Sequence, residues 1–196
     1  MFKRLQRILA HFKSTESLVL QLANADNIAA LEALRMLQER QILQQGGLSG
    51  ANLSGASLNN ATFAEAVMRG VNFSNAKLAG TYFYNTKLQQ ANFTNANLDG
   101  ANLRQAQLLD AQLDGATFKL ANLARVNLQN TTLKNADFTS ANLWSANLCG
   151  ADLTGAILHH ANFQGAIMDE ATRLPDGSSW SEELDMTQFT RSSPEI

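Results

Sequence analysis

Large apolar residues stand at every fifth position from Leu48 to Met168, without one insertion or deletion. These twenty-five positions hold sixteen Leu, seven Phe and two Met. Two residues before each of them lies a second column, in which nineteen of twenty-five residues are Ala. Because a short repeat of fixed length has to build the same local structure each time, this pattern constrains the fold more than composition does.

A period of five excludes the two commonest regular structures. In an α-helix, residues five apart are rotated by about 140°, so no apolar stripe forms. In a straight strand, an odd step reverses the face on which a side chain lies. The column can therefore stay on one side only if the chain bends once per unit, always in the same sense. Such a chain forms coils that stack as short parallel strands, which predicts a β-solenoid with an interior of Leu and Phe.

Two further columns indicate where the chain bends. The residue after the small one is often Asn or Asp, whose side chains satisfy backbone groups at bends. The residue two after the large one is often Gly or Asn, which tolerate the positive φ of a type II turn. The first column contains Asn52, Asn72, Asn92, Asn97, Asn102, Asn122, Asn127, Asp137, Asn142, Asn147, Asp152 and Asn162.

The unit A-(N/D)-(L/F)-x-x resembles the pentapeptide repeat family, as ANLSG, ANFTN, ADFTS and ADLTG illustrate. The resemblance covers residues 46–171. It implies an all-β solenoid, a right-handed quadrilateral β-helix with four units per coil and about six coils. The interior is then expected to include Leu53, Phe63, Phe73, Phe83, Phe93, Leu103, Leu123, Leu143 and Phe163.

The two ends of the chain depart from the repeat. Residues 1–45 have helical spacing and are expected to form an N-terminal helical cap, with Asp26 capping one helix and Gly46-Gly47 ending it. Residues 172–196 are expected to form a C-terminal capping turn and tail. In that tail Trp180 or Phe189 is predicted to cover the open end of the solenoid, because exposed ladder edges need caps.

The sequence predicts no enzyme. It contains no phosphate-binding loop, no zinc-binding motif and no nucleophile motif, so we assign no catalytic residue, cofactor or metal. His159 and His160 are interpreted as solvated, and Cys149 as an exposed thiol. A single Cys, no membrane-length apolar run and no signal-peptide pattern lead us to expect a cytoplasmic protein.

Charge bears on a function known in the resembling family, the binding of DNA gyrase by imitation of DNA. A mimic needs a continuous acidic surface in place of phosphates. Residues 46–171 contain eight acids and seven bases, a net charge of −1. A gyrase modulator is therefore an alternative function that the charge disfavours, and the scattered bases predict no nucleic-acid binding.

One predicted side of the rod carries residues that are enriched at protein interfaces. With four units per coil, Tyr84, Arg104 and Trp144 share an outward column, and Tyr82 lies beside it. We expect a scaffold that binds another protein, or a second copy of itself, through this side. A stack of Tyr84 with Arg104 that only steadies the sheet is the competing interpretation.

The N-terminus suggests a second alternative, a membrane-surface adaptor. Lys3, Arg4, Arg7 and Lys13 accompany an apolar stripe in residues 1–13, and a basic amphipathic helix can lie on an anionic membrane. We favour packing against the protein over membrane contact. The partner, pathway and oligomeric state stay open.

Overall fold

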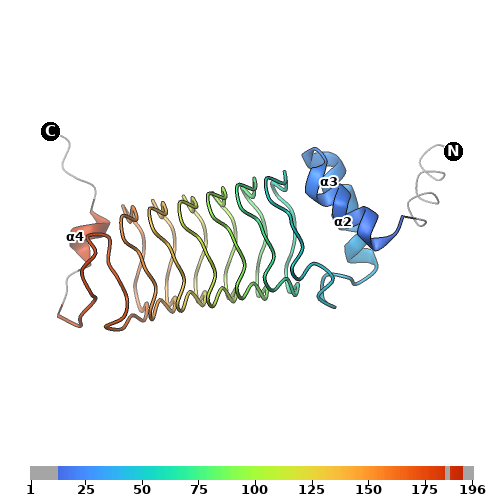
Figure 1. Ribbon diagram of the computed structural model, residues 1–196. Coiled ribbons are helices and arrows are strands. Elements are labelled where there is room, and N and C mark those ends of the chain that lie inside the picture. Colours follow the sequence, from blue (N-terminus) through green and yellow to red (C-terminus); the bar gives the residue numbers. More distant parts are fainter. Residues whose placement is uncertain (1–12, 184–185, 192–196) are drawn as a thin grey trace.

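The protein is a rod of stacked coils with helices at both ends (Figure 1). The computed structural model describes residues 13–183 and 186–191. Helices α2 (Thr15–Asn24) and α3 (Asn27–Glu39) lie at one end of the rod, and the short α4 (Thr187–Thr190) lies at the other. Within the described part of the chain, none of the helices has the length and apolar character needed to cross a membrane.

Parallel bridges show that four units make one coil. Asn52 pairs with Asn72, Ser57 with Lys77, and this spacing of twenty residues repeats down the rod as far as Asn147 and Ile167. The cross-section therefore has four sides, which we call A to D after their inward residues. Side A carries Leu48, Met68 and every twentieth residue after them; side B starts at Leu53, side C at Leu58 and side D at Phe63. Sides C and D each stack six levels, as expected for about six coils.

Every corner is the same hydrogen-bonded turn. From Leu48 to Phe163, the carbonyl of each inward residue accepts from the N–H three residues later, as Leu48 O does from Ala51 at 3.1 Å. The third residue of the turn has a positive φ whether it is Gly50 (φ 69°) or Leu120 (φ 58°). The predicted turn with positive φ is confirmed.

The Asn and Asp column does what the sequence predicts. Each of its twelve members accepts, through Oδ1, the backbone N–H two residues later. These bonds hold the first half of the turn, because that N–H has no partner in the ladder.

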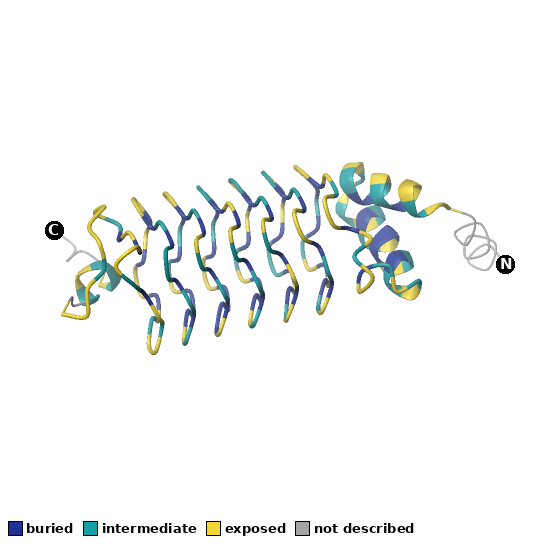
Figure 2. Cartoon of the chain, turned by 60° about the horizontal axis from the view of Figure 1, so that its bottom comes forward, coloured by how far each residue is buried: buried dark blue, intermediate teal, exposed yellow. Residues whose placement is uncertain are grey.

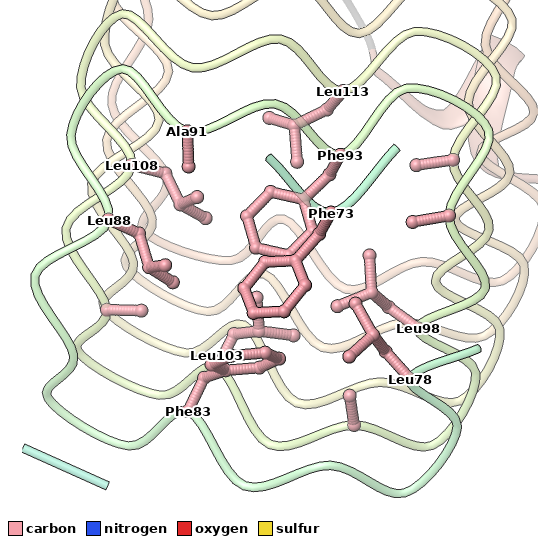
Figure 3. Packing of buried hydrophobic residues seen from close by; sticks show 14 of the residues in the cluster. Phe73, Leu78, Phe83, Leu88, Ala91, Phe93, Leu98, Leu103, Leu108 and Leu113 are labelled. Atoms are coloured by element: carbon pink, nitrogen blue, oxygen red, sulfur yellow. The ribbon is translucent and has the colours of Figure 1, made fainter. Parts of the chain in front are cut away.

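The interior is a continuous stack of apolar side chains (Figure 3). Phe73 and Phe93 stack from one side with ring centroids 5.2 Å apart, and Phe83 meets both edge-on at 5.9 Å. The small column is buried too, and where it holds Thr the hydroxyl is satisfied: Thr86 Oγ1 donates to Phe63 O at 2.8 Å. Figure 2 shows the resulting alternation of buried and exposed residues along each coil.

Phe163 is less buried than predicted for a core position. The other eight predicted core residues are fully buried, whereas Phe163 is only half-buried and packs at the margin of the core. The reason is that side D ends there: its last bridge joins Asn142 to Asn162, and no later described residue pairs beneath it.

Both N-terminal helices begin with a side-chain N-cap. Helix α3 ends earlier than predicted. Ser14 and Asp26 are the N-caps, each accepting an N–H of the first turn, as predicted for Asp26. The helix ends at Glu39, seven residues before Gly46, because Gln41 adopts a left-handed φ of 58°. Ile42 N–H then bonds Leu37 O and Gln41 N–H bonds Gln38 O, which closes the helix without a glycine.

At the C-terminal end the ladder continues after a one-residue insertion. Asp152 pairs with Arg173, twenty-one residues on, and Leu174 takes the inward place on side B. The chain then turns, and Arg173 forms an antiparallel bridge with Ser179. Trp180 and Phe189 are half-buried and pack against the core, and Thr190 O accepts the N–H of His160 at 2.7 Å. Both predicted capping side chains therefore lie at this end of the rod.

Candidate interaction face

Side D carries the largest exposed aromatic side chains of the described rod. Tyr82 is 52% exposed and Trp144 is 37% exposed, whereas the inward residues next to them in sequence, Phe83 and Leu143, are buried. Tyr84 is half-buried and Arg104 is exposed. Because Tyr84, Arg104 and Trp144 occupy the same turn position at multiples of twenty residues, they form one column along the rod.

The backbone positions these side chains rigidly. Asn102 Oδ1 accepts the N–H of Arg104 at 3.1 Å, and Asn142 Oδ1 accepts that of Trp144 at the same distance. The Asn of the same unit thus fixes the turn from which each of these two side chains projects. Because these turns are already ordered, binding through this column requires no ordering of the backbone, which favours affinity.

Arg125 is a member of this face that sequence reasoning missed. Its guanidinium lies over the Trp144 ring, 4.8 Å from the centroid. Arg125 occupies the third turn residue of the coil before Trp144, nineteen residues earlier, and its N–H bonds Trp144 O at 2.8 Å. The signal available in the sequence was therefore an Arg nineteen residues before an outward aromatic. The cation holds the indole, so Trp144 and Arg125 act as one unit.

The charges of the rod form no acidic surface. Side D carries one acid against two bases, side C two against two, side A three against two and side B two against one, so no side has an excess of more than one acid. Several of the acids also accept hydrogen bonds from the backbone of the next coil. Asp99 Oδ1 accepts the N–H of Lys119 at 3.0 Å, and Asp114 Oδ1 accepts the N–H of Lys134 at 2.8 Å.

Two Asp residues of the turn column are paired with Lys from the coil before. Asp137 lies 3.1 Å from Lys119 Nζ and Asp152 lies 3.3 Å from Lys134 Nζ. Partial burial alone would raise the pKa of Asp137. Hydrogen bonds from Thr139 and the charge of Lys119 outweigh it, so the pKa is lowered. The pKa of Asp152 is lowered against the same opposing effect, by Thr154 and Lys134.

The other polar residues singled out in the sequence form no metal site among the described residues. His159 and His160 are both exposed, and in the part of the chain that the structure describes no three His, Cys, Asp or Glu side chains gather as metal ligands would. The prediction that Cys149 is an exposed thiol is wrong, because Cys149 is half-buried on side A. Burial and the charge of Asp169 raise the pKa of its thiol. The basic stripe of residues 1–13 lies, except for Lys13, outside the described residues.

Comparison with known proteins places the repeat in a family. The family model described as Pentapeptide repeats (8 copies) matches residues 110–139, 118–155 and 133–169, and the model described as Pentapeptide repeat region matches residues 39–113. The known fold of the family is a right-handed quadrilateral β-helix. A search of curated proteins gave no match.

Several solved structures are similar. The pentapeptide repeat protein Rfr23 from the cyanobacterium Cyanothece 51142 is 27% identical, over 63% of this chain and 88% of that one, with a TM-score of 0.42. HetL from Nostoc sp. strain PCC 7120, involved in heterocyst differentiation regulation, is 30% identical over 67% and 73%, with a TM-score of 0.36. QnrB1, a plasmid-mediated fluoroquinolone resistance protein, is 18% identical over 62% and 76%, with a TM-score of 0.41.

Proposed function

Since the two models together cover residues 39–169, the chain belongs to the pentapeptide repeat family; we propose that it is a non-catalytic scaffold that binds another protein through side D. The observation that carries the proposal is the exposed Trp144, held under the Arg125 guanidinium in the same column as Arg104 and Tyr84. Trp, Tyr and Arg dominate the energetics of protein interfaces, since each can supply about 2 kcal/mol or more.

These side chains contribute less to the stability of the fold than they could contribute to binding. The inward column and the Asn column already satisfy the core and the turns, and small or polar residues such as Ser, Gln, Thr and Ala fill the same outward position in most other units of the rod. An exposed Trp with its ring desolvated on one face is costly to retain without a partner, and it is a common anchor of an interface. The partner under this proposal is a protein with a flat surface carrying acidic groups opposite Arg104.

The gyrase-modulator alternative is weaker on the same surface. The eight acids of residues 46–171 are accompanied by seven bases, with both signs on every side, and four of the acids, Asp99, Asp114, Asp137 and Asp152, accept hydrogen bonds from their own rod or from its Lys side chains. The membrane-adaptor alternative depends on residues 1–13, almost all of which lie outside the described chain.

The test compares two triple variants. In the first, Tyr84, Arg104 and Trp144 are replaced by Ser; in the control, Arg69, Leu109 and Gln129, which hold the same turn position on side A, are replaced by Ser. The melting temperature of the first variant should change little, because surface substitutions usually move stability within about 0.5 kcal/mol.

Binding should separate the two variants. Capture of partners from the host lysate, followed by mass spectrometry, should yield a protein that is retained by the wild type and the side A control but lost by the side D variant. Sedimentation mass measured on the same samples detects self-association. A large loss of stability with unchanged association would mean that side D is structural and the interface lies elsewhere.

A further inference from the structure

The N-terminal end of the rod is a set of strand edges that need hydrogen-bond partners. In each later coil, the residue before the inward one donates its N–H to the coil above, as Asn72 does to Ala51 O at 2.9 Å. The first full coil, residues 51–70, has no full coil above it, because residues 46–50 lie above side A alone and donate Gly50 N–H to Arg69 O at 2.8 Å. The other three sides therefore present unpaired N–H and C=O groups unless another segment covers them.

The segment from α3 to Leu43 provides hydrogen bonds on three of the four sides. On side A, Leu43 O accepts the N–H of Val67 at 2.8 Å. On side C, Asn27 Nδ2 donates to Asn59 O at 3.4 Å. On side D, Gln38 Nε2 donates to Thr62 O at 2.6 Å.

On side B this segment, all of which the structure describes, forms no hydrogen bond at all. Within the described residues, the N–H and C=O of Asn52 and the C=O of Ser54 have no hydrogen-bond partner, and both residues are exposed. In the coil below, the equivalent groups are all paired: Asn72 donates to Ala51, while Asn72 O and Ser74 O accept from Leu53 and Gly55. The free groups of side B thus repeat the pattern by which one coil binds the next.

A groove of about 580 Å³ lies beside this open edge, between α2 and residues 47–54. From α2 the groove is lined by the apolar residues Val19, Leu20 and Ala23 and by the polar residues Thr15, Glu16 and Asn24, and Leu20 is 66% exposed. Among the described residues that line it, Glu16 is the one charged group. The groove therefore combines a row of backbone donors and acceptors, an apolar wall and a negative charge.

We propose that this groove binds an extended peptide segment of a partner protein, which adds a strand to side B above Asn52. The backbone groups require an extended ligand, because a helix uses its own N–H and C=O groups internally. The wall of Val19, Leu20 and Ala23 receives an apolar side chain, and Glu16 selects a basic neighbour. The site lies at the end of the rod, is separate from the side D column and does not depend on the proposed function of that column.

The edge itself is tested by amide hydrogen exchange in the full chain. The Asn52 amide should exchange at the rate of an open amide, whereas the Asn72 amide, which is paired in the ladder, should be strongly protected. Strong protection of Asn52 in the free protein would overturn the proposal, because the edge would then already be covered by the chain itself or by a second copy.

The probe for binding is a panel of end-blocked pentapeptides of the form Thr-Φ-Lys-Φ-Thr. Each Φ is Val, Ile, Leu, Met or Phe, and a matched panel has Glu in place of Lys. At least one Lys peptide should protect the Asn52 amide and should bind at least tenfold more tightly than its Glu twin. N-methylation of the alternate amides on one edge of that peptide should weaken binding at least tenfold, since it removes the backbone donors to the rod.

Two variants of the protein locate the apolar wall. Leu20→Arg should abolish protection of Asn52 by the peptide, whereas Ile28→Arg should leave it unchanged, because Ile28 is 75% exposed on α3 and does not line the groove. The side D triple variant should still bind. Failure of every panel peptide to protect Asn52 at millimolar concentration, insensitivity to N-methylation, or equal effects of the two Arg variants would each overturn the proposal.

Discussion

The corners of adjacent coils pack against each other in a way that one pair of glycine substitutions can measure. Gly115 on side B has a φ of 68° and Gly100 on side C has a φ of 65°, so both turns need the same backbone conformation. They differ in what a methyl group would meet. At Gly100 no atom lies within 4 Å, whereas at Gly115 the carboxamide oxygen of Asn95, one coil above, is well inside van der Waals contact.

The structure therefore predicts unequal losses of stability. Alanine at a positive φ costs about 1–2 kcal/mol, and this strain is common to both variants. In Gly115→Ala the Asn95 side chain has to leave its rotamer as well, which adds on the order of 0.5–1.5 kcal/mol. For a chain of this length, 1 kcal/mol corresponds to about 2–4 °C in melting temperature. Gly115→Ala should thus melt a few degrees below Gly100→Ala.

A double-mutant cycle isolates the contact. In an Asn95→Ala background the oxygen is absent, and Gly115→Ala should then cost no more than Gly100→Ala. The expected coupling free energy is at least about 0.5 kcal/mol, measured by urea unfolding followed by circular dichroism. Equal effects of the two glycine substitutions, or a coupling of zero, would refute the idea that Asn above Gly is a packing unit of this rod.

Three further predictions concern the core, the charges and the alternative function. Leu103→Asp should give insoluble or strongly destabilised protein, because Leu103 is fully buried and an unpaired polar group there costs about 2–7 kcal/mol. An unchanged melting temperature and solubility would contradict the interior position of Leu103. Against the opposing effect of partial burial, the pKa of Asp137 is lowered in the folded protein by hydrogen bonds from Thr139 and by Lys119, so its carboxylate stabilises the protein above the unfolded pKa of about 3.9, and this stability is lost as pH falls through the folded pKa; Asp137→Asn should therefore flatten the acid side of the melting profile. DNA gyrase supercoiling should be unaffected by micromolar protein, and an inhibition that weakens with salt would show that local acidic groups suffice.

Much of the fold could be predicted because the repeat leaves few choices. The interval of five fixed the inward column, and all twelve Asn and Asp residues of the turn column form the predicted bonds. These features depend only on residues within one unit or directly above it. The period alone did not give the number of units per coil; it came from the family resemblance and is confirmed by the bridges of Asn52 with Asn72 and their equivalents.

The features that the sequence did not reveal are all breaks in the repeat. Phe163 continues the column but lacks a coil beneath it, so its sequence position is regular and its burial is not. Because one residue is inserted before Leu174, this last inward residue does not fall on the interval of five and cannot be found by counting. Helix α3 ends at Glu39, two residues before Gln41, because Gln41, a residue with little turn preference, adopts a left-handed conformation that the bonds to Leu37 O and Gln38 O stabilise. The Arg125–Trp144 contact required the side-chain geometry of two coils.

Within this fold, the positions that are free to specify a partner are few. Three of the five residues in a unit are constrained throughout: one fills the core, one fits the corner inside and one adopts a positive φ. A fourth bonds the turn where it is Asn or Asp. The residue after the inward one is the least constrained, and that is where Tyr84, Arg104 and Trp144 lie. The rod ends are the other exception, because their edge groups have no repeat to pair with them, as at Asn52. A binding surface on such a rod should therefore lie along one outward column or at one end, and both proposed sites have this placement.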